Sequence, residues 1–176
     1  MTEKFPDAAL CSGATAASAG TEVCQKTNRS SRLQMLSRRM VERVHHTSVM
    51  PDHPLHITIL DDDLSVRTAI RRLLRTSDIS VDLYATSMEL FDAISGHSPD
   101  CLILDLQMPG MNGLDVMNYL SHIGIRVPTV VITAHDEPGS RETCLAAGAS
   151  AYLRKPLDAD ELLVAIDNAI SASTPR

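Results

Sequence analysis

The feature of this sequence that most constrains its fold is an alternation of short apolar runs with helical patterns, which begins at residue 55. Five runs are candidate strands: His56–Leu60, Val81–Tyr84, Cys101–Leu104, Val127–Ile132 and Ala149–Leu153. The segments between them carry apolar residues at helical spacing, as over Val66–Leu74. Strands that alternate with helices are typical of a parallel sheet covered by helices on both faces. The sequence therefore predicts a doubly wound α/β domain.

Capping residues mark where several of these helices begin and end. Ser, Thr, Asp and Asn side chains accept hydrogen bonds from the free N–H groups of a helix start, and glycine favours the position after a helix end. The candidate caps are Thr86 with Glu89, Asn112, Asp158 with Glu161, and Gly148. They fall between the apolar runs and support five strand–helix units within about 120 residues, a usual size for one domain.

Polar side chains follow four of the five predicted strands, at the edge of a parallel sheet where ligands bind. They are Asp61, Asp62 and Asp63 after the first strand, Asp105 after the third, Thr133 after the fourth and Lys155 after the fifth. Taken singly, such residues also have structural roles that involve no ligand. Asp63 could cap the next helix, Thr133 could bond to the backbone at a strand end, and Lys155 could be a solvated cation. If the first and third strands are neighbours, however, Asp61, Asp62 and Asp105 converge.

Three converging carboxylates have a definite chemistry. At about 4 Å and an effective dielectric constant near 20, each pair repels by about 4 kcal/mol, so the group must hold protons or bind a cation. A site of oxygen ligands with few protein groups suits Mg²⁺. Lys155 adds a charge for a phosphoryl oxygen and Thr133 adds a hydroxyl donor. This combination is what phosphoryl transfer to an aspartate requires.

Composition excludes several classes of function. The net charge is −6 and aromatic residues are 3% with no Trp, which argues against a nucleic-acid-binding surface. No apolar run is long enough for a membrane span. The four cysteines have no C-x-x-C spacing, and Cys101 and Cys144 lie in apolar patterns as small core residues. A reducing, cytoplasmic location is the simplest expectation.

The first 54 residues differ from the rest of the chain in composition and charge. Residues 1–52 hold seven Lys and Arg against five Asp and Glu, whereas the remainder is strongly acidic. Apolar residues between Leu33 and Val44 lie near one helical face, so a basic amphipathic helix for a partner, an anionic membrane or nucleic acid is one alternative. A disordered extension over residues 1–54 is the interpretation that we favour.

Four motifs resemble the receiver domain of two-component response regulators, which has the CheY-like fold. The sequences around DLQMPGMNG and VITAH also resemble the receiver half of FixJ-type regulators. The motifs are ILDDD (59–63), LILDLQMPGMNG (102–113), VVITAH (130–135) and AYLRKP (151–156). The resemblance implies a flavodoxin-like (βα)5 fold with strand order 2-1-3-4-5 over residues 55–172, followed by a short tail at 173–176.

The resemblance also implies a role for each site residue. Asp105 would accept the phosphoryl group. Mg²⁺ would be bound directly by Asp62, Asp105 and the main-chain carbonyl of Gln107, and by Asp61 through a water molecule. Phosphoryl oxygens would be bound by Thr133, Lys155 and the Ala134 amide. Thr133 and Tyr152 would form the conformational switch, although Tyr152 could instead be a half-exposed strand residue. The Lys155–Pro156 peptide bond would be cis. Gln107 and His135 occupy positions that tune phosphoryl lifetime, although His135 could simply be exposed.

The function implied is that of a single-domain response regulator. A histidine kinase or histidine phosphotransfer protein would phosphorylate Asp105, and a downstream effector protein would read the new surface. The chain would dephosphorylate itself and would not be a turnover enzyme. No DNA-binding domain is expected after residue 172, and a homodimer can form on phosphorylation in this family.

Two other functions are compatible with parts of the pattern. Asp61 to Ser65 approximate the D-x-D motif of haloacid-dehalogenase phosphatases, in which Asp61 would be the nucleophile. That family needs a later acidic pair, for which only Asp158 and Asp160 are available. A receiver fold that binds partners without phosphorylation is the other alternative, disfavoured because none of the phosphorylation residues is missing.

Overall fold

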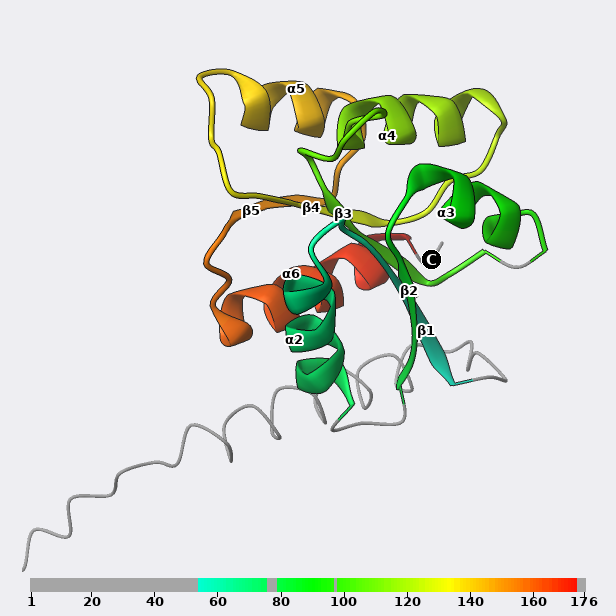
Figure 1. The fold of residues 1–176 in the computed structure, drawn as a ribbon, viewed down its shortest axis with the longest axis vertical. Helices are drawn as coiled ribbons and strands as arrows, with labels where there is room; N and C mark the ends of the chain where they lie inside the picture. The colour runs from blue at the N-terminus through cyan, green and yellow to red at the C-terminus, as the bar shows by residue number, and fades with distance from the viewer. Residues whose placement is uncertain (1–53, 76–78, 97, 174–176) are drawn as a thin grey trace, which may run out of the picture.

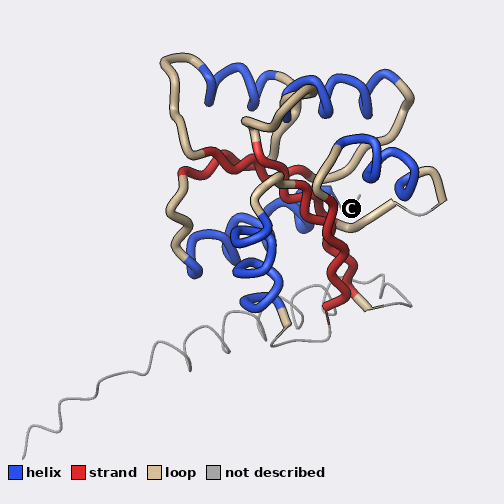
Figure 2. Tube along the Cα trace, viewed as in Figure 1, coloured by secondary structure: helices blue, strands red, loops and turns tan. Residues whose placement is uncertain are grey.

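The computed structural model describes residues 54–75, 79–96 and 98–173, and these form one five-stranded parallel sheet with helices on both faces (Figures 1 and 2). The strands are β1 (Leu55–Leu60), β2 (Ile79–Tyr84), β3 (Cys101–Asp105), β4 (Thr129–Thr133) and β5 (Ala151–Arg154). Their order is β2-β1-β3-β4-β5. The predicted fold class and strand order are therefore confirmed.

The helices divide into two layers (Figure 1). They are α2 (Leu64–Leu74), α3 (Ser87–Ile94), α4 (Gly113–His122), α5 (Ser140–Ala146) and α6 (Ala159–Ser173). Helices α2 and α6 cover one face of the sheet, and α3, α4 and α5 cover the other. No helix in the described part of the chain is long and apolar enough to cross a membrane.

Each central strand contributes side chains to two separate cores. On β3, Cys101 and Ile103 pack with the α2 and α6 layer, whereas Leu102 and Leu104 pack with the opposite layer. Because both faces of the sheet are covered, these strands have no polar face, which is why they read as unbroken apolar runs. Cys101 and Cys144 are both buried free thiols, as predicted.

The predicted caps are present, and each strand differs from its predicted range by one or two residues at one end or both. Thr86 and Glu89 form a complete capping box on α3, and Asn112 accepts a hydrogen bond from Asp115 at the start of α4. β4 begins at Thr129 instead of Val127, because Pro128 has no N–H to donate to a neighbouring strand. β5 begins at Ala151 instead of Ala149, whose N–H donates to the Cys144 carbonyl and closes α5.

The predicted basic extension falls on residues 1–54, and all of it except Pro54 lies outside the described residues. The structure therefore does not test either alternative for this segment. The described polypeptide enters the fold at Pro54, which is exposed and leads directly into β1.

Candidate functional site

Strand register brings the predicted site residues to one edge of the sheet. Leu60 pairs with Leu104, so Asp61 follows β1 at the level where Asp105 ends β3. Asp105 pairs in turn with Ile132, which places Thr133 one residue further on. Lys155 follows β5, and its N–H donates to the Thr133 carbonyl at 2.7 Å. Residues far apart in the sequence thus meet at the carboxyl ends of β1, β3, β4 and β5.

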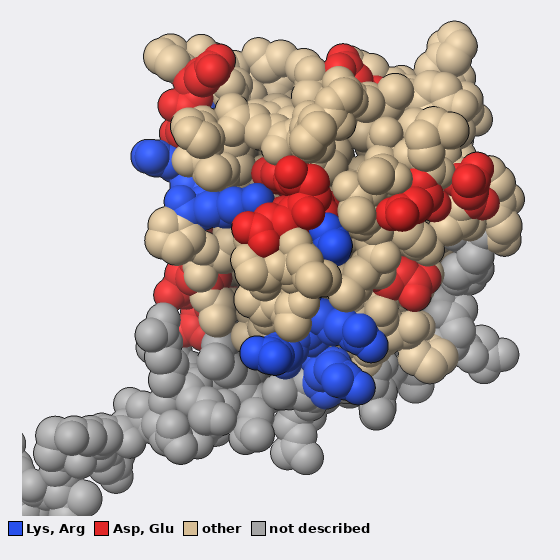
Figure 3. Space-filling model, in the orientation of Figure 1, with Lys and Arg blue, Asp and Glu red and all other residues tan. Residues whose placement is uncertain are grey.

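Three carboxylates gather at this edge, and we call Asp61, Asp62 and Asp105 the carboxylate pocket. One oxygen of each lies within 4.8 Å of the others. Asp61 and Asp105 are buried, whereas Asp62 is exposed and opens the pocket to solvent. Figure 3 shows acidic side chains gathered in the middle of this face of the molecule. Asp63 stays outside the group because it caps α2, where its carboxylate accepts hydrogen bonds from Ser65.

Lys155 supplies a positive charge to the carboxylate pocket. Its Nζ donates a hydrogen bond to Asp61 Oδ2 at 2.7 Å and lies 3.2 Å from Asp105 Oδ1. Burial opposes the charge of Lys155, but the hydrogen bond to Asp61 and the attraction of both carboxylates outweigh it, so the pKa of Lys155 is raised. At neutral pH, Lys155 is therefore a fixed cation against the two buried aspartates.

The Asp105 carboxylate is held in an unfavourable ionised state. Burial raises its pKa, the nearby Asp61 raises it further, and Lys155 opposes both. Asp105 Oδ1 is buried and has the ion-pair contact with Lys155 but no hydrogen bond. A divalent cation would relieve this charge, and a set of three carboxylate ligands fits the preference of Mg²⁺ for oxygen donors. The residues present therefore fit the expected cofactor.

Thr133 is fully buried beside this pocket, but its hydroxyl points to another partner. Thr133 Oγ1 donates to the His135 carbonyl at 2.8 Å. The His135 ring is exposed, and its Nδ1 lies 2.8 Å from Gln107 Oε1, within hydrogen-bond distance. The loops that follow β3 and β4 are therefore joined by a polar contact across the rim of the pocket. The sequence pointed to Gln107 and His135 separately but did not predict that their side chains contact each other.

Tyr152 is buried in the layer formed by α3, α4 and α5, at 3% exposure. The alternative of a half-exposed strand residue was therefore wrong. Its hydroxyl donates to Asp136 Oδ1 at 3.0 Å. Asp136 also lies 3.6 Å from the Arg154 side chain, so one carboxylate of the β4–α5 loop contacts two residues of β5. We name Asp136, Tyr152 and Arg154 the loop clamp.

The loop clamp gives a testable titration. Burial, and then the hydrogen bond and charge of Asp136, raise the pKa of Tyr152 to about 12. We expect the difference in phenolate absorbance between wild type and Tyr152→Phe to titrate near this value. In Asp136→Asn, the pKa should fall because a negative neighbour is removed, yet stay above 10.0 because burial remains. Circular dichroism would verify the folded state, and a wild-type midpoint near 10 would contradict the prediction.

Other expected site residues lie on the surrounding loops. Gln107 and Ala134 are exposed, on the segments after β3 and β4. The Lys155–Pro156 peptide bond is cis. Arg67 and Asp136 were not among the predicted residues, although both contact predicted ones. Arg67 could have been noticed as a cation on the helix face of Ile70 and Leu74, whereas nothing in the sequence marks Asp136 as a partner of Tyr152.

One glycine allows α4 to begin directly against the end of β3, the strand that carries Asp105. Gly113 donates its N–H to the Leu106 carbonyl at 2.9 Å. A Cβ at this position would collide with the Asp105 carbonyl oxygen and would lie 2.9 Å from the Leu106 Cα. The approach is therefore possible only without a side chain, and it fixes the backbone that carries Asp105.

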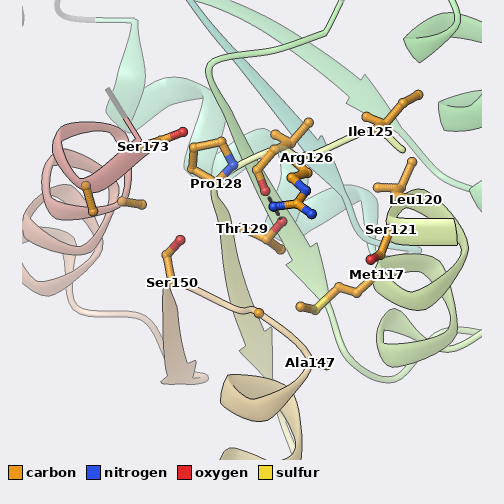
Figure 4. Close-up of a pocket in the computed structure, with 14 residues that line it drawn as sticks. Met117, Leu120, Ser121, Ile125, Arg126, Pro128, Thr129, Ala147, Ser150 and Ser173 are labelled. Atoms are coloured by element: carbon orange, nitrogen blue, oxygen red, sulfur yellow. Dashed lines mark hydrogen bonds between the residues drawn. The ribbon is translucent and has the colours of Figure 1, made fainter. Parts of the chain in front are cut away.

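A separate hollow of about 420 Å³ lies near the start of β4 (Figure 4). Its walls include Met117 and Leu120 of α4, Ile125, and Ala169 of α6, with Arg126 as the charged lining residue. None of the carboxylates of the pocket described above lines it. The hollow therefore forms no part of the carboxylate pocket.

Comparison with known proteins agrees with this geometry. The model of the response regulator receiver domain family matches residues 57–167. Response regulator MprA from Mycobacterium sp. (strain KMS) is 37% identical over 122 residues, which cover 69% of this chain and 53% of MprA. MprA from Mycolicibacterium vanbaalenii is 38% identical over the same length. The chain thus spans about half the length of these curated relatives.

Solved structures give the same result. A response regulator receiver protein from Burkholderia phymatum is 45% identical with a TM-score of 0.60, over 69% of this chain and 99% of that protein. FixJ-N has a TM-score of 0.63 at 24% identity, over 69% of this chain and 98% of FixJ-N, and so supports the fold. Together with the family match over residues 57–167, these findings show that the chain belongs to the response regulator receiver domain family of two-component systems.

Proposed function

We propose that this chain accepts a phosphoryl group on Asp105 from a histidine kinase or histidine phosphotransfer protein, and that the modification changes which effector protein it binds. The observation that supports this most directly is the state of Asp105. Its Oδ1 is buried without a hydrogen bond, close to two carboxylates and one lysine. An oxygen with no hydrogen bond keeps its lone pairs available for a new bond.

The proposed reaction transfers a phosphoryl group from a histidine of the donor protein to the Asp105 carboxylate. An Asp105 carboxylate oxygen forms a bond to phosphorus, while the bond from phosphorus to the donor imidazole nitrogen breaks and that nitrogen regains its electron pair. Mg²⁺ held by Asp61, Asp62, Asp105 and the Gln107 carbonyl would neutralise phosphoryl and carboxylate charge when bound. Lys155 already lies against Asp105 and would pair with a phosphoryl oxygen. The exposed Asp62 leaves a path for the donor.

The readout would begin at Thr133. The Thr133 hydroxyl donates its hydrogen bond to the His135 carbonyl. A phosphoryl group on Asp105 would offer this hydroxyl a charged acceptor oxygen, and the Ala134 amide would donate a hydrogen bond to the same phosphoryl group. A move of Thr133 toward the phosphoryl group would pull on His135 and on the loop that carries Asp136. The loop clamp on Tyr152 would then rearrange, which shifts the balance between two conformations of this face.

Several finer features belong to the same proposal. We propose that the chain works in the cytoplasm, that it loses the phosphoryl group by its own hydrolysis, and that phosphorylated copies can pair with one another. Residues 55–172 would be the receiver domain, residues 1–54 its extension and residues 173–176 its tail. The first of these features to test is pairing, by comparing the oligomeric state of the phosphorylated and unphosphorylated chain.

The phosphatase alternative finds less support in the geometry. Asp61 is fully buried, and its two carboxylate oxygens accept hydrogen bonds from the Asp63 N–H and from Lys155. A carboxylate whose two oxygens both accept hydrogen bonds is poorly placed for nucleophilic attack. Asp158, which that family would need as part of an acidic pair, instead caps α6.

The proposal predicts which aspartate takes up phosphate. With acetyl phosphate and Mg²⁺, the wild type should gain the mass of one phosphoryl group, acetate being released. Asp105→Asn should remain unmodified, because an amide oxygen is a poor nucleophile. Intact-protein mass spectrometry measures the result, and Asp92→Asn on α3 serves as the control that keeps the wild-type mass shift.

The three functions give different outcomes in this experiment. Modification that persists in Asp105→Asn but disappears in Asp61→Asn would favour the phosphatase. A wild type that stays unmodified with acetyl phosphate and with histidine kinases would favour a binding module. Either result would overturn the proposal, whereas modification confined to Asp105 would support it.

A further inference from the structure

We propose that Arg67 is a positioning residue of the carboxylate pocket: it fixes the peptide unit that carries Asp62, and thereby sets the affinity of the pocket for a divalent cation. The inference rests on the proposed function and deepens it. Arg67 lies in the first turn of α2 and is 9% exposed. Its Nη1 donates a hydrogen bond to the main-chain carbonyl of Asp61.

The burial of Arg67 needs a compensating contact. A guanidinium loses its hydration when buried and is normally paired with a carboxylate. The ion pairs among the described residues do not include Arg67. The bond to the Asp61 carbonyl is therefore the side-chain contact that accounts for its place beside Ile70 and Leu74, on the apolar face of α2.

That bond completes the immobilisation of Asp61. The Asp61 N–H donates to the Tyr84 carbonyl at 3.3 Å, and the carboxylate accepts from the Asp63 N–H at 2.8 Å and from Lys155 at 2.7 Å. The carbonyl is the remaining polar group of this residue, and Arg67 binds it. Every hydrogen-bonding group of Asp61 is thus used.

The consequence falls on Asp62. Its carboxylate is exposed, so packing does not fix its direction. The peptide unit between Asp61 and Asp62 includes the carbonyl that Arg67 holds, and this unit sets the orientation of the Asp62 backbone. Groups that orient a metal ligand in this way typically change metal affinity by about 10- to 100-fold when they are removed.

The charge of Arg67 affects Mg²⁺ affinity in the opposite direction to its hydrogen bond, and this difference makes the inference testable. A guanidinium near the pocket repels a second cation, so its removal by itself would tighten Mg²⁺ binding. Loss of orientation would weaken binding. The sign of the change in Mg²⁺ affinity therefore separates a positioning role from a role as a simple counter-charge.

The experiment measures Mg²⁺ binding to the full chain by isothermal titration calorimetry without any phosphoryl donor. We expect Arg67→Met to raise the Kd by about tenfold or more. Arg67→Lys should bind more tightly than Arg67→Met, because lysine keeps a donor. Arg71→Met, an exposed arginine on the same helix, should bind as the wild type does. In the metal-free protein, the Asp62 and Asp63 amides should exchange hydrogen faster in Arg67→Met than in Arg71→Met.

A second variant keeps the test valid if Arg67→Met does not fold. Arg67→Gln removes the charge, and its side chain ends two bonds short of the Arg67 Nη1. It therefore loses the hydrogen bond to the Asp61 carbonyl and should raise the Kd for Mg²⁺ as Arg67→Met does. An unchanged or lower Kd in Arg67→Met or in Arg67→Gln would overturn the positioning role. A wild type that binds Mg²⁺ but takes up no phosphate would count against the proposed function alone, and a wild type that binds no Mg²⁺ would overturn both.

Discussion

Gly113→Ala is expected to destabilise the domain by about 3 kcal/mol and to lower the melting temperature by about 10 °C. The added Cβ would meet the Asp105 carbonyl oxygen, at the end of the buried strand β3, and the Leu106 Cα, one residue beyond that strand. Backbone atoms cannot rotate away as the end of a flexible side chain can. Either α4 must separate from β3 or the end of β3 must shift, and both cost packing.

The second expected effect of this variant is on the site. A shift of the Asp105 backbone moves the carboxylate away from Lys155 and Asp61, so the rate of phosphorylation by acetyl phosphate should fall by at least about tenfold. Urea unfolding and mass spectrometry measure the two effects. Gly96→Ala is the matched control, because a Cβ there would lie at an ordinary van der Waals distance, 3.8 Å, from the Ala93 carbonyl oxygen. Equal stability of the two alanine variants would refute the close approach that we describe.

Lys155→Met is expected to cost about 3 kcal/mol of unfolding free energy at neutral pH without Mg²⁺. The lysine is the cation of two buried aspartates, and its side chain is 16% exposed. Without it, Asp61 and Asp105 remain buried and charged with no ion-pair partner. Arg154→Met removes the neighbouring cation, whose side chain is 67% exposed, and should cost far less.

The loss in Lys155→Met should depend on pH and on Mg²⁺. The pKa of Asp105 is already raised above 3.8 in the folded protein, so its ionisation lowers stability as the pH rises through that folded-state value. Without Lys155 this penalty grows, and protonation removes it. The difference from wild type in urea unfolding should therefore shrink between about pH 7 and about pH 4, and also in saturating Mg²⁺. A difference that is constant across these conditions would show that Lys155 acts by packing alone.

The sequence predicted the sheet because the central strands are buried on both faces and must be apolar throughout. Cys101–Leu104 and Val127–Ile132 could hardly be surface segments, and the polar residues at their ends identified the functional edge. The caps were equally readable, since Thr86 and Asn112 act on residues within one helical turn. Local chemistry of this kind leaves a local signature.

Contacts across the fold were less accessible from sequence. The positions of Asp61, Asp105 and Lys155 follow from strand ends, but the choice of partners does not. Thr133 bonds to the His135 carbonyl, and Tyr152 bonds to Asp136, because of loop paths that no spacing specifies. The buried state of Tyr152 depends on how α4 and α5 pack. Strand boundaries were displaced where single N–H groups, such as that of Ala149, had another acceptor.

The loop clamp also determines how much free energy a conformational change of this face would require. The contacts of Asp136 with Tyr152 and Arg154 are polar: a hydrogen bond to a carboxylate contributes about 1.5 to 3 kcal/mol net, and an exposed ion pair contributes at most about 1 kcal/mol. The apolar strands beneath are held by burial worth far more. Breaking the clamp would therefore rearrange the β4–α5 loop and the Tyr152 side chain while the central strands stay packed, so phosphorylation could alter recognition without unfolding the sheet.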